Sequence, residues 1–261
     1  SAIAIVHSFV SNQGDAWTFT SGYLDRFVEM QRLLPDSDAT SETVDGVPYS
    51  LYMQQMGKRV AEMHMALASR EDLEAFRPEP VRAETIRGWI DDIATRAEPV
   101  LTSLSLTHTP VRETDRQLIE QASALGPGLR AWLERLVPET LDIDAIRHHG
   151  DFHLGQTLIV KDDIFIIDFE GEPRRSLTER RRKAPAARDV AGLLRSIDYA
   201  ATAALERAFE IAPEDQGRLA AALEGWRERA AASFVISYRE TITDTRLWPE
   251  DAAVAERLLN F

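Results

Sequence analysis

Cysteine is absent from the 261 residues of this chain. Without thiols the chain forms neither a disulfide nor a zinc–thiolate site, and it has no thiol nucleophile. A chain with no oxidative framework favours the cytoplasm as its location. Long apolar runs are missing as well: none approaches the roughly 20 residues that a membrane-spanning helix requires, which argues against a membrane partner.

Lysine is scarce, and negative charge outweighs positive charge. Only Lys58, Lys161 and Lys183 stand beside the arginines, and the formal net charge is −13. Because nucleic-acid backbones select clustered positive charge, a nucleic-acid partner is not expected. The length allows one large domain, or one lobe of a larger enzyme, with a substantial core.

Apolar residues recur at helical spacing along most of the chain, which predicts a mainly α fold. The expected helices run from Thr20 or Ser21 to about residue 34, from Pro48 past Leu67, and over residues 83–104, 112–136, 188–209, 214–244 and 251–259. Two β-branched runs, 157–160 and 164–167, interrupt this pattern with a short polar stretch between them. They predict one small β hairpin.

The most informative stretch surrounds that hairpin. It begins His149-Gly150-Asp151-Phe152-His153-Leu154-Gly155-Gln156, and twelve residues after the glutamine comes Asp168, within Ile-Asp-Phe-Glu-Gly-Glu. Protein kinases carry the pattern H-R-D-x-x-x-x-N and a later D-F-G. The same offsets here give H-G-D-x-x-x-x-Q and D-F-E. Residues 147–172 are therefore interpreted as a catalytic loop, a hairpin and a metal-binding motif.

Phosphoryl transfer gives each of these side chains a task. One carboxylate must receive the proton of the acceptor hydroxyl, and oxygen ligands must hold Mg²⁺ against the triphosphate. We assign the first task to Asp151 as the catalytic base. Gln156 and Asp168 offer the hard oxygen atoms that Mg²⁺ prefers, and His149 is expected to brace the loop.

A different metal chemistry is the alternative for the same segment. Side chains at alternate positions of an extended strand lie on one face, so His149, Asp151 and His153 could together bind zinc. No further cluster of histidines and carboxylates in the sequence completes such a site.

A second aspartate has a predicted structural role. Arg188-Asp189-Val190-Ala191-Gly192 stands at the start of an expected helix. A buried Asp189 could accept backbone N–H bonds from the catalytic loop and hold its shape, with Arg188 beside it. The plain alternative is an ordinary helix cap.

Residues 149–201 resemble a particular family more closely than kinases in general. His-Gly-Asp-Phe-His-Leu-Gly-Gln, Ile-Asp-Phe-Glu-Gly-Glu-Pro and Arg-Asp-Val-Ala-Gly-Leu-Leu-Arg-Ser-Ile-Asp-Tyr-Ala-Ala are similar to maltokinases, including the maltokinase domains fused to trehalose synthase. The early Val-Ser-Asn-Gln-Gly-Asp-Ala-Trp, residues 10–17, resembles the same family. The Glu-Pro extension and the Arg-Ser-x-Asp-Tyr string are not general kinase features.

The resemblance implies ATP-dependent phosphorylation of maltose, or a related sugar, to maltose 1-phosphate for glycogen-type synthesis. It implies ATP and Mg²⁺ as cofactors and a fused or associated trehalose synthase domain as a partner. The resemblance implies that Asp151 is the catalytic residue and that Gln156 and Asp168 bind the metal ion. It also implies that Glu170 lies beside the metal ion and the phosphates.

Sugar contacts follow from a later part of the same resemblance. Trp226-x-x-Arg229 and Tyr238 resemble the sugar-binding helix of the family, since aromatic faces pack against the C–H surface of sugars. His153 of the catalytic motif is a further candidate contact. For the aromatic residues the competing interpretation is ordinary core packing at helical spacing.

The sequence also departs from the family. It has no Gly-rich loop and no lysine before Lys58, whereas a complete kinase needs a small β-rich lobe that covers ATP and supplies a lysine. We therefore expect residues 1–261 to form the C-terminal lobe of a protein-kinase-like fold without the ATP-covering lobe. Alone, such a lobe should transfer phosphate poorly, because positioning supplies most of the catalysis.

Two other functions remain open on the sequence. A phosphotransferase acting on another sugar or an aminoglycoside shares the His-Gly-Asp and Ile-Asp motifs. A non-catalytic domain attached to trehalose synthase is the third candidate, although the intact Asp151, Gln156 and Asp168 argue against it.

Overall fold

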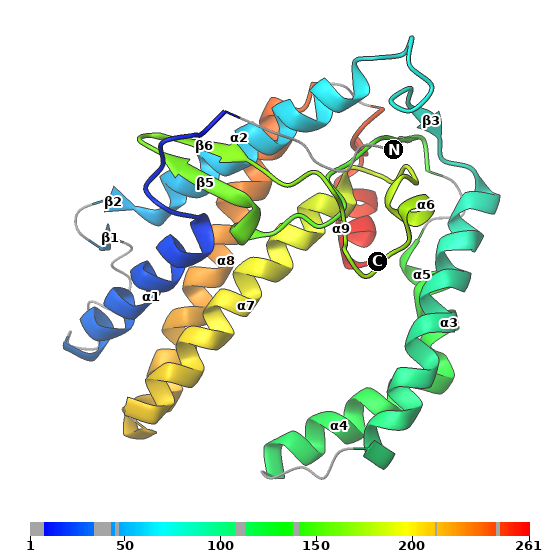
Figure 1. The fold of residues 1–261 in the computed structure, drawn as a ribbon. Coiled ribbons are helices and arrows are strands. Elements are labelled where there is room, and N and C mark those ends of the chain that lie inside the picture. Colours follow the sequence, from blue (N-terminus) through cyan, green and yellow to red (C-terminus); the bar gives the residue numbers. More distant parts are fainter. Residues whose placement is uncertain are drawn as a thin grey trace.

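A computed structural model describes residues 8–33, 43–44, 47–107, 113–137, 141–211, 213–243 and 246–261 (Figure 1). The described part of the chain is mostly helical, as the sequence predicts. Its elements, in chain order, are α1 (Ala16–Leu33), β1 (Thr43–Val44), β2 (Val47–Pro48), α2 (Tyr49–Ala68), β3 (Glu79–Pro80), α3 (Ala83–Thr107), α4 (Glu113–Leu125), η2 (Gly126–Gly128), α5 (Leu129–Leu136), β4 (Asp144–Ala145), η3 (Leu154–Gln156), β5 (Thr157–Val160), β6 (Asp163–Ile166), α6 (Leu177–Arg180), α7 (Ala187–Ile211), η4 (Pro213–Asp215), α8 (Gln216–Thr241) and α9 (Ala252–Asn260).

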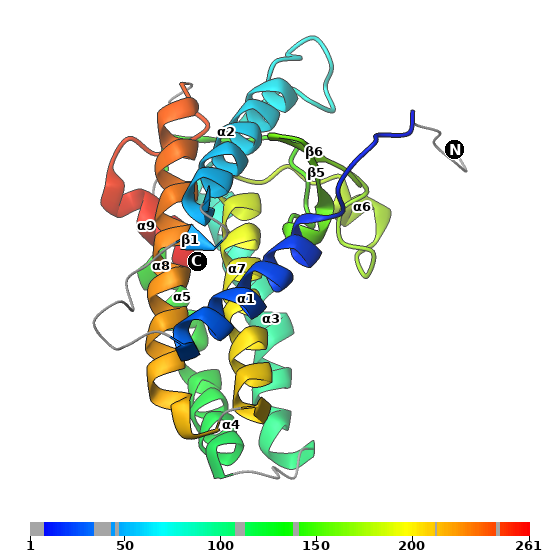
Figure 2. The same ribbon diagram turned by 90° about the vertical axis from the view of Figure 1, so that its left-hand side faces the viewer.

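The helices form two groups (Figures 1 and 2). In one group α2 packs along α8, and α7 packs against both α8 and α1. In the other group α3 packs against α4 and α5. Helix α9 contacts α7 on one side and α5 on the other, so it joins the two groups. None of the helices in the described part of the chain is long and apolar enough to span a membrane.

The beginning of α1 differs from the expectation. The sequence predicts a start at Thr20 or Ser21, but the helix begins at Ala16 because Asp15 caps it. The Asp15 carboxylate accepts hydrogen bonds from the backbone N–H of Thr18, at 2.9 Å, and from its hydroxyl, at 2.8 Å. Thr20 instead lies buried inside the helix, where its hydroxyl pairs with that of Tyr49 at 2.7 Å.

The helix expected over residues 112–136 is also wrong in one respect. It is broken into α4 and α5 by a short 3₁₀ turn at Gly126–Gly128. Pro127 lies in that turn, and proline removes a backbone donor while glycine lowers helical propensity. Pro99, by contrast, lies inside α3 without ending it.

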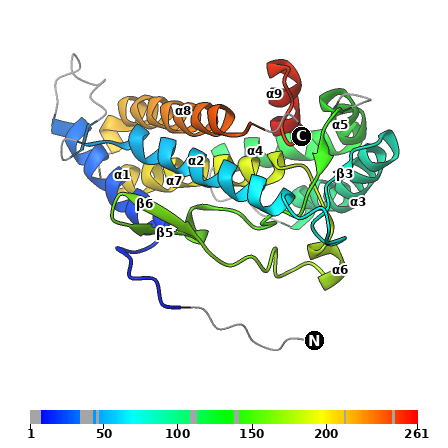
Figure 3. The same cartoon turned by 90° about the horizontal axis from the view of Figure 1, so that it is seen from above.

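The predicted hairpin is confirmed, and two smaller strand pairs accompany it. Strands β5 and β6 are antiparallel, with Thr157 opposite Ile166 and Val160 opposite Asp163. The pairs β1–β2 and β3–β4 have two residues per strand, and neither was expected. Figure 3 shows the β5–β6 hairpin lying along one side of the α2 and α7 helices. The hairpin therefore rests on the larger helical group.

One close helix crossing depends on a glycine. A methyl group at Gly57 of α2 would collide with backbone atoms of α8, namely the carbonyl oxygen of Phe234 and the nitrogen of Tyr238. We predict that Gly57→Ala lowers the free energy of unfolding by about 1–3 kcal/mol, because the two helices must move apart. Urea unfolding followed by circular dichroism measures the change.

The matched control is Gly88→Ala in α3, where an added methyl group meets no atom within 4 Å. There the replacement should leave stability unchanged or raise it by up to about 1 kcal/mol, since alanine favours the helix. Equal behaviour of the two variants would contradict the proposed collision.

Candidate active site

The catalytic loop is held by a buried aspartate at the start of α7. Asp189 is 1% exposed, and its two carboxylate oxygens accept the backbone N–H groups of His149, at 2.7 Å, and Gly150, at 2.9 Å. Burial raises the pKa of this carboxyl, but the bond to His64 and the N–H of Gly150 lower it more, so the pKa lies well below its usual range. The carboxylate is therefore ionised and fixes the loop.

A buried histidine, which the sequence analysis missed, completes this support. His64 of α2 is fully buried, and its Nε2 lies 3.1 Å from Asp189 Oδ2. Its Nδ1 lies 2.9 Å from the hydroxyl oxygen of Tyr238 in α8. Since an ionised carboxylate only accepts, Nε2 donates to Asp189. The only sequence signal was a histidine on the apolar face of an amphipathic helix.

The same loop lies against the backbone of α7. A methyl group at Gly192 would come within 2.7 Å of the carbonyl oxygen of Phe152, so this close approach requires glycine. One turn further on, the hydroxyl of Ser196 accepts the N–H of Leu154 at 3.1 Å. Gly150 has a φ of +87°, a conformation that glycine adopts without strain. These contacts set the path of the chain on both sides of Asp151.

His149 links the catalytic loop to the strand that leads to Asp168. Its Nε2 donates to the carbonyl oxygen of Ile167 at 2.8 Å, and its ring packs against Phe169 with ring centres 5.0 Å apart. The histidine is 1% exposed, so it acts inside the structure. Asp151, two residues later, is half-buried, and no residue of the described chain hydrogen-bonds to its carboxylate. That carboxylate can therefore receive a proton from an incoming hydroxyl.

The two predicted metal ligands lie next to each other. The amide Nε2 of Gln156 lies 3.2 Å from Oδ2 of Asp168. The backbone carbonyl of Gln156 also accepts the N–H of Ile167 at 3.0 Å. Asp168 has a φ of +64°, an uncommon conformation for a residue other than glycine. An amide oxygen and a carboxylate are hard donors, so this pair fits Mg²⁺.

An ion pair ties the hairpin to α2. Both carboxylate oxygens of Asp163 are bonded to the guanidinium of Arg59, at 2.7 and 2.5 Å, and Gln55 adds a third bond at 2.7 Å. The bonds from Arg59 hold the pKa of the Asp163 carboxyl well below its usual range. This clamp sits at the turn end of the hairpin, whose other end carries Gln156 and Asp168. No sequence motif marked it.

The zinc hypothesis is not supported. In the part of the chain that the structure describes, no group of three or more histidine, aspartate and glutamate side chains is placed to hold a metal ion. His149 uses its Nε2 for the carbonyl of Ile167, and His153 uses its Nδ1 to accept the N–H of Gly155 at 3.1 Å. The alternation of His149, Asp151 and His153 therefore does not bring them onto one metal.

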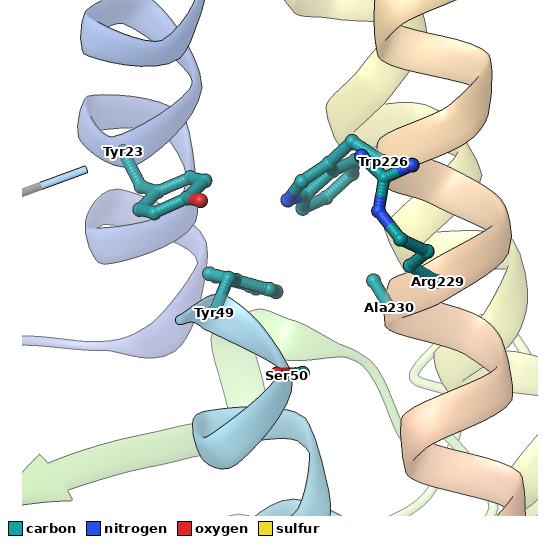
Figure 4. A pocket seen from close by; sticks show the side chains of 6 residues that line it. All are labelled: Tyr23, Tyr49, Ser50, Trp226, Arg229 and Ala230. Carbon is teal, nitrogen blue, oxygen red and sulfur yellow. The ribbon is translucent and has the colours of Figure 1, made fainter. Parts of the chain in front are cut away.

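The prediction that Tyr238 contacts a sugar is wrong. Its side chain is fully buried, and its hydroxyl pairs with His64 behind the catalytic loop. Because its side chain is fully buried among core residues and its hydroxyl is already paired with His64, the competing interpretation, core packing, holds. Trp226 and Arg229 do line one recess (Figure 4), together with residues of α1 and α2 but none of the catalytic loop.

Three predicted residues remain, namely Glu170, His153 and Arg188. Glu170 is exposed, with Oε2 4.0 Å from Nη1 of Arg180, while Arg180 also donates to the backbone carbonyl of Glu170 at 3.3 Å. Arg188 is exposed as well, and its side chain lines a cavity instead of reaching the loop backbone. The roles assigned to Glu170, His153 and Arg188 remain predictions.

That cavity lies between the two helical groups. Its empty space, open to solvent, is about 840 Å³, and it is bounded by α3, by the segment that leads into α7, and by α9. The lining residues are Trp89, Asp92, Ile93, Arg175, Ala184, Pro185, Ala187, Arg188, Ala191, Leu258 and Phe261. Because Arg188 directly precedes Asp189, the cavity opens beside the support of the catalytic loop.

Comparison with known proteins identifies the family of the chain. The model of the phosphotransferase enzyme family (APH) matches residues 11–232. The chain belongs to this family. Figure 1 shows that the matched region runs from α1 to the middle of α8 and includes the catalytic loop and the hairpin.

Relatives within the phosphotransferase family include two glucosamine kinases. The one from Streptacidiphilus jiangxiensis is 28% identical over 194 residues, which are 72% of this chain and 37% of the relative. The one from Mycolicibacterium smegmatis (strain ATCC 700084 / mc(2)155) is 25% identical over 251 residues, or 92% and 51% of the two chains. The chain thus spans about half the length, or less, of these curated relatives.

Solved structures share the fold. A glucosamine kinase in crystal form A matches with a TM-score of 0.67 and 25% identity, over 94% of this chain and 52% of its own. A glucosamine kinase in complex with glucosamine, ADP and inorganic phosphate matches with a TM-score of 0.68 and 24% identity, over 96% and 51%. None of these relatives is a maltokinase, so the predicted links to maltose, glycogen and trehalose synthase find no support here.

Proposed function

We propose that this phosphotransferase uses ATP to phosphorylate a hydroxyl group of a sugar, with glucosamine as the first candidate acceptor. The observation that carries the proposal is that Asp189 fixes the loop of Asp151, while His149 of that loop is bonded to Ile167, next to the contact between Gln156 and Asp168. Residues 147–172 thus carry an acceptor for the hydroxyl proton and two oxygen ligands for a cation. That combination is the requirement of phosphoryl transfer.

The chemistry assigned to Asp151 is proton transfer. The acceptor oxygen forms a bond to the γ-phosphorus as the bond to the β,γ-bridging oxygen breaks, and ADP leaves. The hydroxyl proton passes to the Asp151 carboxylate. His149 and Asp189 act earlier, because they hold the loop in place before the acceptor arrives. Preorganised positioning of this kind supplies much of the rate enhancement.

Gln156 and Asp168 are the residues that would hold Mg²⁺. When bound, the ion neutralises charge on the transferring phosphates. Asp168 lies two residues after the β6 strand, has an uncommon backbone conformation, and places its carboxylate beside Gln156. The Arg59–Asp163 clamp supports this arrangement from the opposite end of the hairpin.

The cavity between α3 and α7 supports a sugar as acceptor. Trp89 offers an aromatic face, which packs well against the C–H surface of a pyranose ring. Asp92, Arg175 and Arg188 supply charged groups for hydroxyl groups around the rim. The space inside it that water-sized groups can fill is about 290 Å³, which is room for a monosaccharide.

Three kinds of acceptor are considered, and the first two each rest on an observation. Glucosamine is favoured because two relatives are glucosamine kinases. The Asp92 carboxylate at the cavity offers a partner for the ammonium group of this sugar. Maltose is the second candidate, because the Arg195-Ser196-x-Asp198-Tyr199 string resembles maltokinases. An aminoglycoside is the third kind of acceptor found in this wider superfamily.

ADP formation in the presence of glucosamine, glucose, maltose and kanamycin separates these acceptors. In a protein that carries residues 1–261 together with an ATP-covering lobe, we expect saturable turnover with glucosamine that depends on Mg²⁺, whereas residues 1–261 alone should turn over poorly. Preference for maltose would support the maltokinase hypothesis instead. In the protein with both lobes, turnover with kanamycin alone, or binding of sugar without any ADP formation under conditions where a glucosamine kinase is active, would contradict a sugar kinase.

The variant Trp89→Ala tests the cavity within the same assay. Loss of the aromatic face should raise KM for the sugar about tenfold, equivalent to about 1.4 kcal/mol, with little change in KM for ATP. Trp132→Ala is the matched control, because Trp132 is a half-exposed tryptophan of α5 outside the cavity. Equal effects of the two replacements would remove the cavity from the proposal.

A further inference from the structure

A second, smaller recess lies where α1, α2 and α8 meet (Figure 4). It encloses about 230 Å³ of empty space, open to solvent, and its interior has room for roughly one water-sized group. The lining residues are Tyr23, Tyr49, Ser50, Trp226, Arg229 and Ala230. None of them belongs to the catalytic loop, the hairpin or the large cavity. The recess is therefore separate from the site described above.

The indole of Trp226 brings an unsatisfied donor to this recess. Its side chain is 3% exposed, and within the described structure its buried Nε1 has no hydrogen-bond partner. Figure 4 shows this nitrogen on the side of the ring that faces Tyr23 and Tyr49. An indole N–H only donates, and a buried donor without an acceptor costs about 1–3 kcal/mol. An acceptor atom bound in the recess would therefore satisfy this donor.

The same recess lies at the N-terminal end of a long helix. Tyr49 and Ser50 are the first two residues of α2, which has 20 residues. No side chain caps this end, and no acidic residue lies in the first turn. The first N–H groups of a helix lack partners within the helix, and the helix dipole favours negative charge there. Both effects select an anion over a neutral acceptor.

Two further side chains add to this preference. The guanidinium of Arg229 lies beside the indole of Trp226 in Figure 4 and contributes positive charge. Ser50 contributes a hydroxyl group at the wall of the recess. The hydroxyl of Tyr49 is already paired with Thr20, so Tyr49 serves as an aromatic wall, with its ring 5.1 Å from that of Trp226.

We propose that this recess binds a small oxyanion, a carboxylate or a phosphate group, through Trp226, Arg229 and the first turn of α2. The narrow interior receives one oxygen atom, which accepts the indole N–H, while the rest of the group remains at the mouth. The proposal does not depend on the catalytic activity. A bound oxyanion would also supply the acceptor that the start of α2 lacks.

Indole N–H signals in a ¹H–¹⁵N correlation spectrum test the proposal directly. The chain has five tryptophans, and Trp226→Phe assigns the signal of Trp226 while keeping an aromatic ring in place. We expect inorganic phosphate, or acetate in a parallel titration, to shift that signal saturably at constant ionic strength. The two titrations distinguish a phosphate site from a carboxylate site.

Trp248 provides an internal control. Its indole nitrogen is also buried and without a partner in the described structure, but it lies outside the recess. Its signal should stay in place while that of Trp226 moves. Phosphate bound near the catalytic loop would likewise leave Trp226 unaffected, so the two sites are told apart.

Arginine variants of α8 complete the test. Arg229→Gln should weaken phosphate or acetate binding about tenfold or more, while Arg227→Gln should change it less than about twofold. Arg227 pairs with Glu224 and does not line the recess. An unmoved Trp226 signal at saturating phosphate and acetate, equal shifts at Trp226 and Trp248, or equal effects of the two arginine variants would overturn the proposal.

Discussion

Replacing Asp151 with asparagine, in a protein that also supplies the ATP-covering lobe, is expected to lower kcat for sugar phosphorylation by at least about a hundredfold, with little change in sugar binding. The amide keeps the size of the side chain but cannot receive the hydroxyl proton. Because Asp151 is half-buried and no described residue bonds to its carboxylate, the replacement should leave the fold intact. Steady-state kinetics with the preferred acceptor, and calorimetric titration with the same sugar, measure the two effects.

Asp162→Asn is the matched control for this prediction. Asp162 is an exposed aspartate in the turn of the β5–β6 hairpin, at the end opposite to Gln156 and Asp168. Its replacement should leave kcat unchanged. If Asp151→Asn retained activity within about tenfold, a loss of under about 1.4 kcal/mol, the assignment of the base would be wrong.

Asp189→Asn should have the largest effect on stability. The carboxylate accepts two backbone N–H groups of the loop and one bond from His64, all in a buried setting. An amide retains only one acceptor oxygen and directs an NH₂ group at a donor, so we expect a loss of about 3–5 kcal/mol in the free energy of unfolding. Urea unfolding measures it. Activity should fall as well, because the loop that carries Asp151 loses its support.

The control for this variant lies on the same helix. Asp198→Asn in α7 changes an aspartate that is exposed at the surface, and it should alter stability by no more than about 0.5 kcal/mol. Similar losses for the two variants would mean that the buried contacts of Asp189 contribute little.

The low pKa of Asp189 also predicts how stability varies with pH. A carboxyl whose pKa is lower in the folded than in the unfolded chain stabilises the fold above its unfolded value, near pH 4. This contribution is lost as the pH falls below about 4, since the unfolded chain then binds the proton more readily. The acid side of the stability curve should be flatter in Asp189→Asn than in the parent protein.

Local sequence patterns were sufficient for the helices and the hairpin. The apolar spacing anticipated α7, α8 and α9 to within a few residues, and the β-branched runs anticipated β5 and β6. Each of these signals depends on neighbours in the chain, through helical period, strand propensity or a polar turn. The errors arose where one residue changed where a helix begins or ends. Asp15 caps α1 earlier than expected, and Pro127 lies in the turn that divides the expected helix into α4 and α5.

Contacts between distant parts of the chain could not be predicted in the same way. His64 and Asp189 are 125 residues apart, and Arg59 and Asp163 are 104 apart. Nothing in the spacing of either pair marks a contact. Tyr238 was mistaken for a sugar contact because an aromatic residue on a helix looks the same in sequence whether it faces a ligand or the core.

The sequence by itself determined the mainly α fold, the hairpin and the presence of a phosphotransferase motif, because these features follow from residues close together in the chain. Only the tertiary structure decided which side chains support the motif and where cavities open. It brought His64 and Tyr238 behind Asp189, and it set the cavity of Trp89 and the recess of Trp226 in separate places. Burial is the physical reason, since it is decided by the packing of whole helices and not by any one segment.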